Sequence, residues 1–345
     1  MRNLGILVIL FLHIHTFAQV AGGRAMFDFL NVSGNAHQAA LGGDNVSVYD
    51  RDPNLFLGNP ALLNKKMDKV FSISYLPYVG DVKSYSLAGA IDVDKLGPFA
   101  IGFKYLDYGK ITERDIYAND LGTFSSKDYA FTLGKSYTIG TISLGVNGKF
   151  LGSEIGSYKT YAWAIDAGAL FKHPEKDFTL GLAVKNFGKT FRTYTETSQD
   201  SLPLNVQIGA TFKPDHAPVR FSLTAHTLNK WDIVYNDPNY STTVDENGKP
   251  VFKKVKNAER LLRHLTAAIE IMPIKAFNLR VGYNYLMSKE LSLSDGLSSA
   301  GLSFGGSIRW DRYQAAYTHT IIHRSNGMNV FTVNVDIGSG YKVQN

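Results

Sequence analysis

The sequence contains no cysteine in its 345 residues. This absence excludes disulfide bonds, thiolate metal sites and cysteine nucleophiles together. Long hydrophobic runs are also missing, because no stretch after the first eighteen residues approaches the roughly 18 apolar residues that a membrane-spanning helix needs. The chain is therefore not expected to carry a helical membrane anchor.

Charge is spread thinly along the chain. The net charge is +6 and the isoelectric point is near 9.1, but the basic residues are not gathered into a stripe or an arm. This scatter argues against nucleic acid as a partner. No catalytic constellation stands out either, so we predict no enzyme activity, no catalytic residue and no cofactor.

Two polar patterns could suggest a metal, and we interpret neither as a site. His319 and His323 are four residues apart, which on a strand is a separation of about 13 Å, too far for a shared ion. Asp50, Asp52 and Asn54 resemble the start of a calcium loop, but the glycine and the distal glutamate of that loop are missing. We expect a solvated turn there.

A glycine-rich stretch, GLSFGGSIR at residues 301–309, lies within a strand pattern. It has no Lys-Ser or Lys-Thr with which a phosphate-binding loop would hold its ligand. We interpret it as a closely packed strand.

The first eighteen residues have the form of a signal peptide. Arg2 is the only charge, an apolar run extends from Leu4 to Leu12, and small residues lead to Ala18. The run is too short to span a bilayer, so we predict cleavage after Ala18 and export of the rest. A short buried helix is the alternative.

Residues 19–66 form an irregular segment without alternation. It contains two fragments that favour short helical turns, NAHQAAL and NPALL. In the second, Asn59 is a good N-cap and Pro60 suits the first helical position, where its missing N–H costs nothing.

From residue 67 to residue 345 the texture changes to segments of about ten residues with apolar side chains at alternate positions. Phe71, Ile73 and Tyr75, for example, alternate with Ser72 and Ser74. About fourteen such segments follow one another, separated by Gly, Pro, Asn, Asp and Ser, and the 12% aromatic content favours strands. The predicted class is all-β.

The links between these segments indicate a membrane barrel. Short links, such as Ile139 to Thr141, alternate with long ones, such as Tyr108 to Lys127 and Gly152 to Lys159. Outer-membrane barrels sort their loops in this way, and a soluble β-sandwich has no reason to do so. The face opposite the apolar one carries polar residues such as Arg220, Arg280 and Arg309, which suits a polar lumen with internal salt bridges. A soluble barrel with ordinary core aromatics is the alternative.

The longest predicted link, Leu228 to Leu262, is a candidate docking loop for a partner. It should continue its strands as a hairpin that turns at Asn247-Gly248. The residues that we single out there are Trp231, Tyr235, Tyr240, Asn247 and Gly248. A loop without a partner is an equally good interpretation.

At the N-terminus the residues carry a resemblance. The pattern FxFLxxxxxAxxAALGGxxVS from Phe27 to Ser47 includes Leu41, Gly42 and Gly43, and Asn59-Pro60-Ala61 follows it. With about fourteen strands after it, the chain resembles the PorV and PorQ family, and within it the PorQ branch; these proteins are relatives of the FadL fatty-acid transporters. The chain ends without the terminal aromatic residue that many outer-membrane barrels carry.

The resemblance implies a fourteen-stranded FadL-like antiparallel barrel in the outer membrane, with residues 19–66 as an N-terminal plug. It further implies a non-enzymatic subunit of the type IX secretion system attachment complex. The expected partners are then outer-membrane lipid, a PorZ-like surface protein and a PorU/PorV-type sortase complex. The alternative function is a FadL-like transporter of hydrophobic small molecules.

Overall fold

The computed structural model of the chain describes residues 26–78, 80–194, 201–235, 243–244, 250–251, 255–291, 298–323 and 326–338. The predicted signal peptide, Tyr240, Asn247 and Gly248 lie outside these residues. Among the helices of the described part, none has the length and apolar character needed to cross a membrane.

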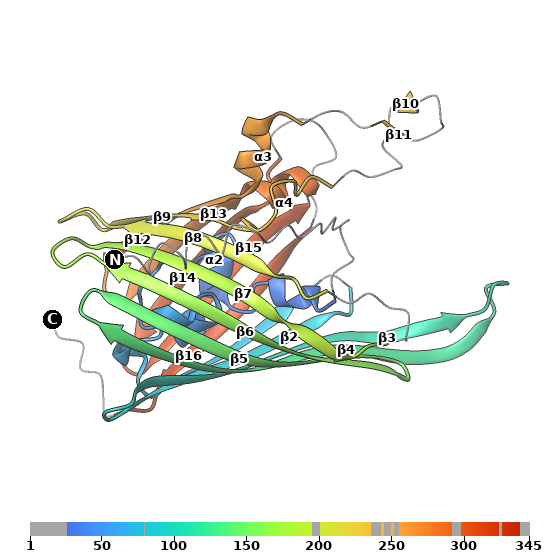
Figure 1. Cartoon of the computed structure of the whole chain (residues 1–345), viewed down its shortest axis with the longest axis horizontal. Coiled ribbons are helices and arrows are strands. Elements are labelled where there is room, and N and C mark those ends of the chain that lie inside the picture. Colours follow the sequence, from blue (N-terminus) through green and yellow to red (C-terminus); the bar gives the residue numbers. More distant parts are fainter. Residues whose placement is uncertain are drawn as a thin grey trace, which may run out of the picture.

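Fourteen of the described strands close into one barrel in which every neighbouring pair is antiparallel (Figure 1). The seam joins the first and last strands, with Phe71 opposite Val335. The predicted barrel of about fourteen strands is thereby confirmed. Its strands are β1 Val70–Pro77, β2 Lys83–Val93, β3 Gly97–Arg114, β4 Asp120–Ile139, β5 Ile142–Ile155, β6 Tyr158–Lys172, β7 Phe178–Arg192, β8 Asn205–Phe212, β9 Val219–Ala225, β12 Leu265–Ile274, β13 Phe277–Asn284, β14 Leu302–Trp310, β15 Tyr313–His323 and β16 Asn326–Asp336.

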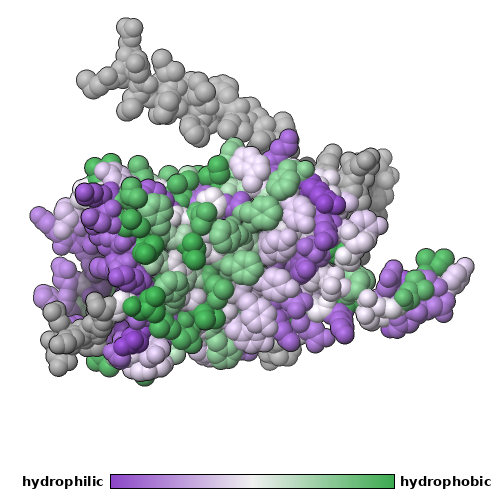
Figure 2. Space-filling model, turned by 90° about the horizontal axis from the view of Figure 1, so that it is seen from below, coloured by the Kyte–Doolittle hydropathy of each residue, from purple (hydrophilic) through white to green (hydrophobic). Residues whose placement is uncertain are grey.

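The two faces of the wall differ as the alternation predicts. Phe71 and Ile73 point outward, and Ile73 is 62% exposed, whereas Ser72 and Ser74 are buried against the lumen. Figure 2 shows the outward side chains as an apolar band between more polar ends. A soluble protein rarely exposes an apolar surface of this size to water. A closed barrel also leaves no backbone edge unpaired, so this surface suits the hydrocarbon of a bilayer.

Two of the predicted long links prove to be strands, and that prediction was wrong. β3 continues to Arg114 and β4 begins at Asp120, so these strands form a hairpin that projects beyond the barrel (Figure 1). Likewise β5 continues to Ile155 and β6 begins at Tyr158. The β-branched and aromatic residues of these stretches favour strands even where no lipid demands alternation.

The wall is uneven in height. β8, β9 and β13 contain only 8, 7 and 8 residues, against 18 and 20 in β3 and β4. Beside the short strands the described chain adds two helices, α3 Asn257–Arg263 and α4 Tyr285–Glu290, and a small hairpin of β10 Thr243–Val244 with β11 Pro250–Val251. The predicted turn at Asn247-Gly248 falls between β10 and β11, outside the described residues.

The N-terminal segment fills the barrel. We call residues 26–67 the plug; in Figure 1 its short helices lie inside the ring of strands. Leu41, Phe56 and Leu62 of the plug are fully buried and belong to one apolar cluster that also includes wall residues such as Ala88 and Leu170. The plug elements are the 3₁₀ helices η2 Asp28–Asn31, η3 Pro53–Leu57, η4 Pro60–Leu62 and η5 Lys65–Met67, and the α-helix α2 Ala36–Ala40.

Candidate functional site: the contact between plug and barrel wall

Asparagine and aspartate side chains begin most turns of the plug. The side-chain oxygen of Asn35 accepts from the N–H of Gln38 at the start of α2, and that of Asn59 accepts from the N–H of Ala61 at the start of η4. Asp52 and Asn64 cap η3 and η5 in the same way. Each cap satisfies a backbone donor that would otherwise be buried without a partner. The predicted helical turns and the capping role of Asn59 are confirmed.

The Asn59-Pro60-Ala61 motif lies against wall glycines. Gly145 of β5 is so close to Pro60 that an added Cβ would overlap the backbone of Pro60, and a Cβ at Gly168 of β6 would overlap the side-chain oxygen of Asn59. The amide of Asn59 also donates to the carbonyl of Val46 (2.8 Å), within the plug. The motif can therefore pack against the wall only where Gly145 and Gly168 lack a side chain.

The Leu41-Gly42-Gly43 turn meets the opposite part of the wall. Gly42 and Gly43 have φ angles of 86° and 94°, a conformation that residues with a Cβ rarely adopt. A Cβ at Gly282 of β13 would overlap the backbone of this turn, and Asn284 donates to the carbonyl of Gly42 (3.1 Å). The turn and the Asn59-Pro60-Ala61 motif thus both dock on glycines of the wall.

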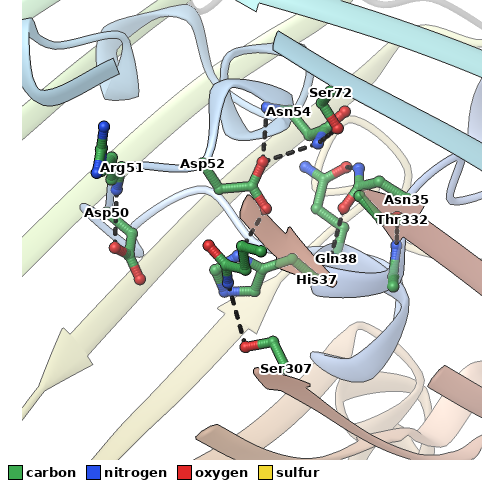
Figure 3. A network of polar contacts seen from close by, with 12 residues as sticks. Asn35, His37, Gln38, Asp50, Arg51, Asp52, Asn54, Ser72, Ser307 and Thr332 are labelled. Atoms are coloured by element: carbon green, nitrogen blue, oxygen red, sulfur yellow. Dashed lines mark hydrogen bonds and ion pairs between the residues drawn. The ribbon is translucent and has the colours of Figure 1, made fainter. Parts of the chain in front are cut away.

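A buried charged network joins the plug to β9, β12 and β13. Figure 3 shows its plug side, where His37 points toward Asp52. In the plug, His37 Nδ1 donates to Asp52 Oδ2 (3.0 Å), and His37 Nε2 lies 3.4 Å from Glu270 Oε1 of β12. Glu270 in turn accepts from Arg220 Nε of β9 (2.6 Å) and from Arg280 Nε of β13 (2.9 Å). The predicted lumen salt bridges of these two arginines are confirmed.

The network returns to the plug through Asp50, whose Oδ2 lies 3.2 Å from Arg220 Nη2. Three basic groups and three carboxylates are thus paired within the lumen. A buried charge is tolerated only with such partners, because an unpaired one would be strongly destabilising. The network therefore holds the plug in one position.

The ionisation of the plug residues reflects these partners. Burial opposes protonation of His37 and Arg280 adds to this, but the hydrogen bonds to Asp52 and Glu270 outweigh both and raise the pKa of the imidazole. Burial tends to raise the pKa of Asp52, yet its contact with His37 lowers it. For Asp50 the charge of Arg220 outweighs burial and lowers the pKa to about 2. The network thus favours a charged imidazole between charged carboxylates.

The expectation of a solvated turn at Asp50, Asp52 and Asn54 was wrong. Asp52 and Asn54 are buried, and Asn54 donates to both Asp52 and Ser72 of β1. Asp52 caps η3 and Asp50 pairs with Arg220, so the alternate spacing of these residues serves the plug structure. Among the described residues no group of three or more His, Asp or Glu side chains could hold a metal ion.

A Gly-x-Ser-x-Gly spacing, which is not among the sequence-based predictions, lies at the start of β14. Residues 301–305 read Gly-Leu-Ser-Phe-Gly, the spacing of the nucleophile elbow of hydrolases. The structure places Ser303 on β14, facing inward, with its hydroxyl 2.9 Å from that of Thr320 on β15. An elbow requires a sharp turn from strand to helix, so the residue is part of the wall.

Of the predicted docking residues, the structure describes Trp231 and Tyr235. Both are exposed, at 55% and 49%. The Trp231 ring stacks on His264, with 6.1 Å between the ring centroids.

Comparisons with known proteins place the fold. No family model and no curated protein matches the sequence. Among solved structures, the toluene transporter TodX of Pseudomonas putida is similar with a TM-score of 0.52 and 12% identity, covering 88% of this chain and 96% of TodX. The deltaS2S3 mutant of TodX, described as a monoaromatic hydrocarbon channel, gives 0.50 and 11%, covering 87% and 96%. A FadL homologue of Pseudomonas aeruginosa gives 0.46 and 11%, covering 88% and 98%. At these identities the likeness shows the fold alone.

Proposed function

We propose that this protein is a plugged outer-membrane channel that admits hydrophobic small molecules. The observation that carries the proposal is a lipid-facing barrel whose lumen is filled by a separate plug, which contacts the wall through hydrogen bonds, ion pairs and apolar side chains. No disulfide bond holds the plug in the lumen, so a rearrangement of these contacts could open it. The fold shared with TodX, described as a toluene transporter, and the resemblance to FadL transporters support the same function.

The proposal requires the plug to move, and the chain offers a direct test. Ser47 of the plug and Thr211 of β8 have their hydroxyl oxygens 2.8 Å apart. Because the native chain has no cysteine, the double variant Ser47→Cys, Thr211→Cys contains only one possible disulfide. Oxidation should lock the plug, and reduction should release it.

The measurement is uptake of a labelled monoaromatic hydrocarbon and of a labelled long-chain fatty acid into cells that produce each variant. The matched control is Ser303→Cys, Thr320→Cys, which joins two wall strands across 2.9 Å and leaves the plug free. We expect the oxidised plug variant alone to lose uptake and to regain it on reduction. Undiminished uptake through the locked plug, or no loss of uptake on deleting the gene, would refute the proposal.

A second candidate is the non-enzymatic attachment subunit of a type IX secretion system. The β3–β4 hairpin supports it, because its tip lies beyond the barrel and carries the apolar residues Ile116 (91% exposed), Tyr117 (78%) and Leu121. Exposed apolar side chains on a projection suit a protein partner. Together with Tyr235 they would contact the PorZ-like and sortase partners.

Affinity purification from native membranes tests this candidate. The intact chain should recover a PorZ-like protein and a PorU/PorV-type sortase complex. A variant whose hairpin is shortened between residues 110 and 124 should recover less of them. Recovery of no such partner by the intact chain would exclude the attachment role while leaving the channel proposal untouched.

A further inference from the structure

A small cavity lies in the lumen between the plug and the wall strands β2 to β5 and β7. It has a volume of about 60 Å³ and is bordered on the plug side by Leu30 to Asn35. A water molecule needs roughly 10–15 Å³ of such space, so the cavity has room for about four waters or one group of similar size. It is too small for an extended hydrocarbon chain.

Three lysines line this cavity: Lys104 of β3, Lys149 of β5 and Lys185 of β7. Lys104 Nζ donates to the carbonyls of Phe29 (2.5 Å) and Val32, so it binds the plug backbone. Lys149 Nζ pairs with Asp166 (2.7 Å). Lys185 makes no hydrogen bond or ion pair with any described residue.

A polar group without a partner faces the same cavity. Ser86 of β2 is 3% exposed, and within the described structure its hydroxyl has no hydrogen-bond partner. Gly34 of the plug lies directly against it, because a Cβ at Gly34 would overlap the Ser86 hydroxyl and would lie 3.6 Å from Cε of Lys104. A buried hydroxyl normally finds a partner, so Ser86 offers a hydrogen-bond donor to a group bound in this cavity.

We propose that this cavity is a binding site for a small oxyanion, a carboxylate or a phosphate group. Asp44 is the only carboxylate among its lining residues, and it already accepts from Gln207 (2.7 Å). Asp166 balances the charge of Lys149, but Lys104 and Lys185 have no carboxylate partner among the described residues. An anion between these ammonium groups would convert their repulsion into charge-assisted hydrogen bonds. Lys185 and Ser86 are the donors left free for it.

The anion has a structural consequence for the plug. Lys104 already binds the backbone at Phe29 and Val32, and a bound anion would link this lysine to Lys149 and Lys185 of the wall. Because all three lysines belong to the wall, the anion would hold in place the Lys104 ammonium group that binds the first part of the plug. The inference goes beyond the proposed function, because binding requires no transport and can be measured on the purified protein.

The test is calorimetric titration of the full-length protein in an uncharged detergent. Inorganic phosphate and acetate represent the free anions, and octyl phosphate and octanoate represent the same groups as lipid headgroups. We expect saturable binding of phosphate or acetate that sodium chloride at the same ionic strength does not mimic. Tighter binding of the octyl compounds would assign the site to a headgroup, and equal binding would assign it to a free anion.

Variants decide whether the cavity is the site. Lys185→Gln should weaken binding roughly tenfold or more, as should Ser86→Ala, which leaves the charge unchanged. Lys189→Gln is the matched control, because Lys189 lies exposed on the same strand and does not line the cavity. Lys185→Arg, which keeps the charge, should bind even if the glutamine variant does not fold. No binding beyond the chloride control, or equal binding by all folded variants, would overturn the proposal.

Discussion

The residues that hold the plug are polar groups from distant parts of the chain. His37 meets Glu270 across more than two hundred residues, and Arg220 and Arg280 converge on the same carboxylate. The alternation of apolar and polar residues along the strands predicted that Arg220 and Arg280 face the lumen. It could not indicate His37 or Glu270, because nothing local distinguishes a histidine on a short helical turn or a glutamate on a strand from solvent-facing ones.

The raised pKa of His37 gives the stability a defined pH dependence. An imidazole whose pKa is higher in the folded state stabilises that state fully below its unfolded pKa, about 6.5, and loses this effect as the pH rises through the folded value. Replacing it by His37→Gln should therefore cost about 1–3 kcal/mol at pH 6 and less at pH 9. Asp52, Glu270 and Arg280 stay in place as its neighbours.

Thermal melts of both proteins in detergent, from pH 5 to pH 9, check this prediction. The difference in melting temperature should shrink toward alkaline pH. A difference that is constant, or that grows with pH, would mean that His37 is not held as a cation by Asp52 and Glu270.

The wall glycines that the plug touches should matter for its docking. Gly282→Ala would place a methyl group against the Leu41-Gly42-Gly43 turn, so we expect a loss of about 1–3 kcal/mol and a looser plug. Gly148→Ala is the control, because no atom lies within 4 Å of the added Cβ. Its effect should be within about 0.5 kcal/mol.

Melting temperature and protease cleavage within the plug measure the effect of both glycine variants. Equal behaviour of the two variants would show that the turn does not press on β13.

At the scale of elements, the period of two predicted the strands but not their ends. Lipid enforces alternation only within the bilayer, so the sequence predicts a loop where β3 and β4 project beyond the barrel. α3 was missed as well, because its seven residues are too few to show a helical period. The plug turns were foreseen because capping is local, whereas their docking on Gly145 and Gly168 depends on contacts across the barrel.

The short strands predict where another segment must meet lipid. The seven residues of β9 extend about 23 Å, which at the usual tilt gives roughly 18 Å of height, against an apolar band of about 25 Å. The exposed side chains just beyond it, Leu228 and Trp231, together with Leu261 of α3, would complete the band. Trp231 should therefore contact acyl chains near the interface.

Fluorescence quenching by lipids with brominated acyl chains checks this contact. The variant Trp163→Phe, Trp310→Phe keeps Trp231 as its only tryptophan. In the control variant all three tryptophans are replaced by Phe, and Tyr117→Trp places a single tryptophan at the exposed hairpin tip. The fluorescence of this tryptophan should not be quenched. If Trp231 is quenched no more than that tip, it faces water or a protein partner.

At the scale of the whole molecule, one physical requirement unites the observations. In a bilayer every strand edge must be paired, and the β1–β16 seam meets this requirement while the apolar side chains face outward. The polar lumen that results can hold a plug by hydrogen bonds and ion pairs. The sequence predicted this architecture, but only the structure shows that Asn59, Gly42 and His37 hold the plug at three separate places on the wall.

The most direct test of this account is the state of the mature chain in lipid. Refolded into lipid vesicles, it should show a circular dichroism spectrum dominated by β-structure and should migrate faster on electrophoresis before boiling than after it. In buffer without detergent or lipid it should aggregate. A mature chain that remains monomeric in such buffer, or whose spectrum is dominated by helix, would contradict the membrane barrel and the channel proposed for it.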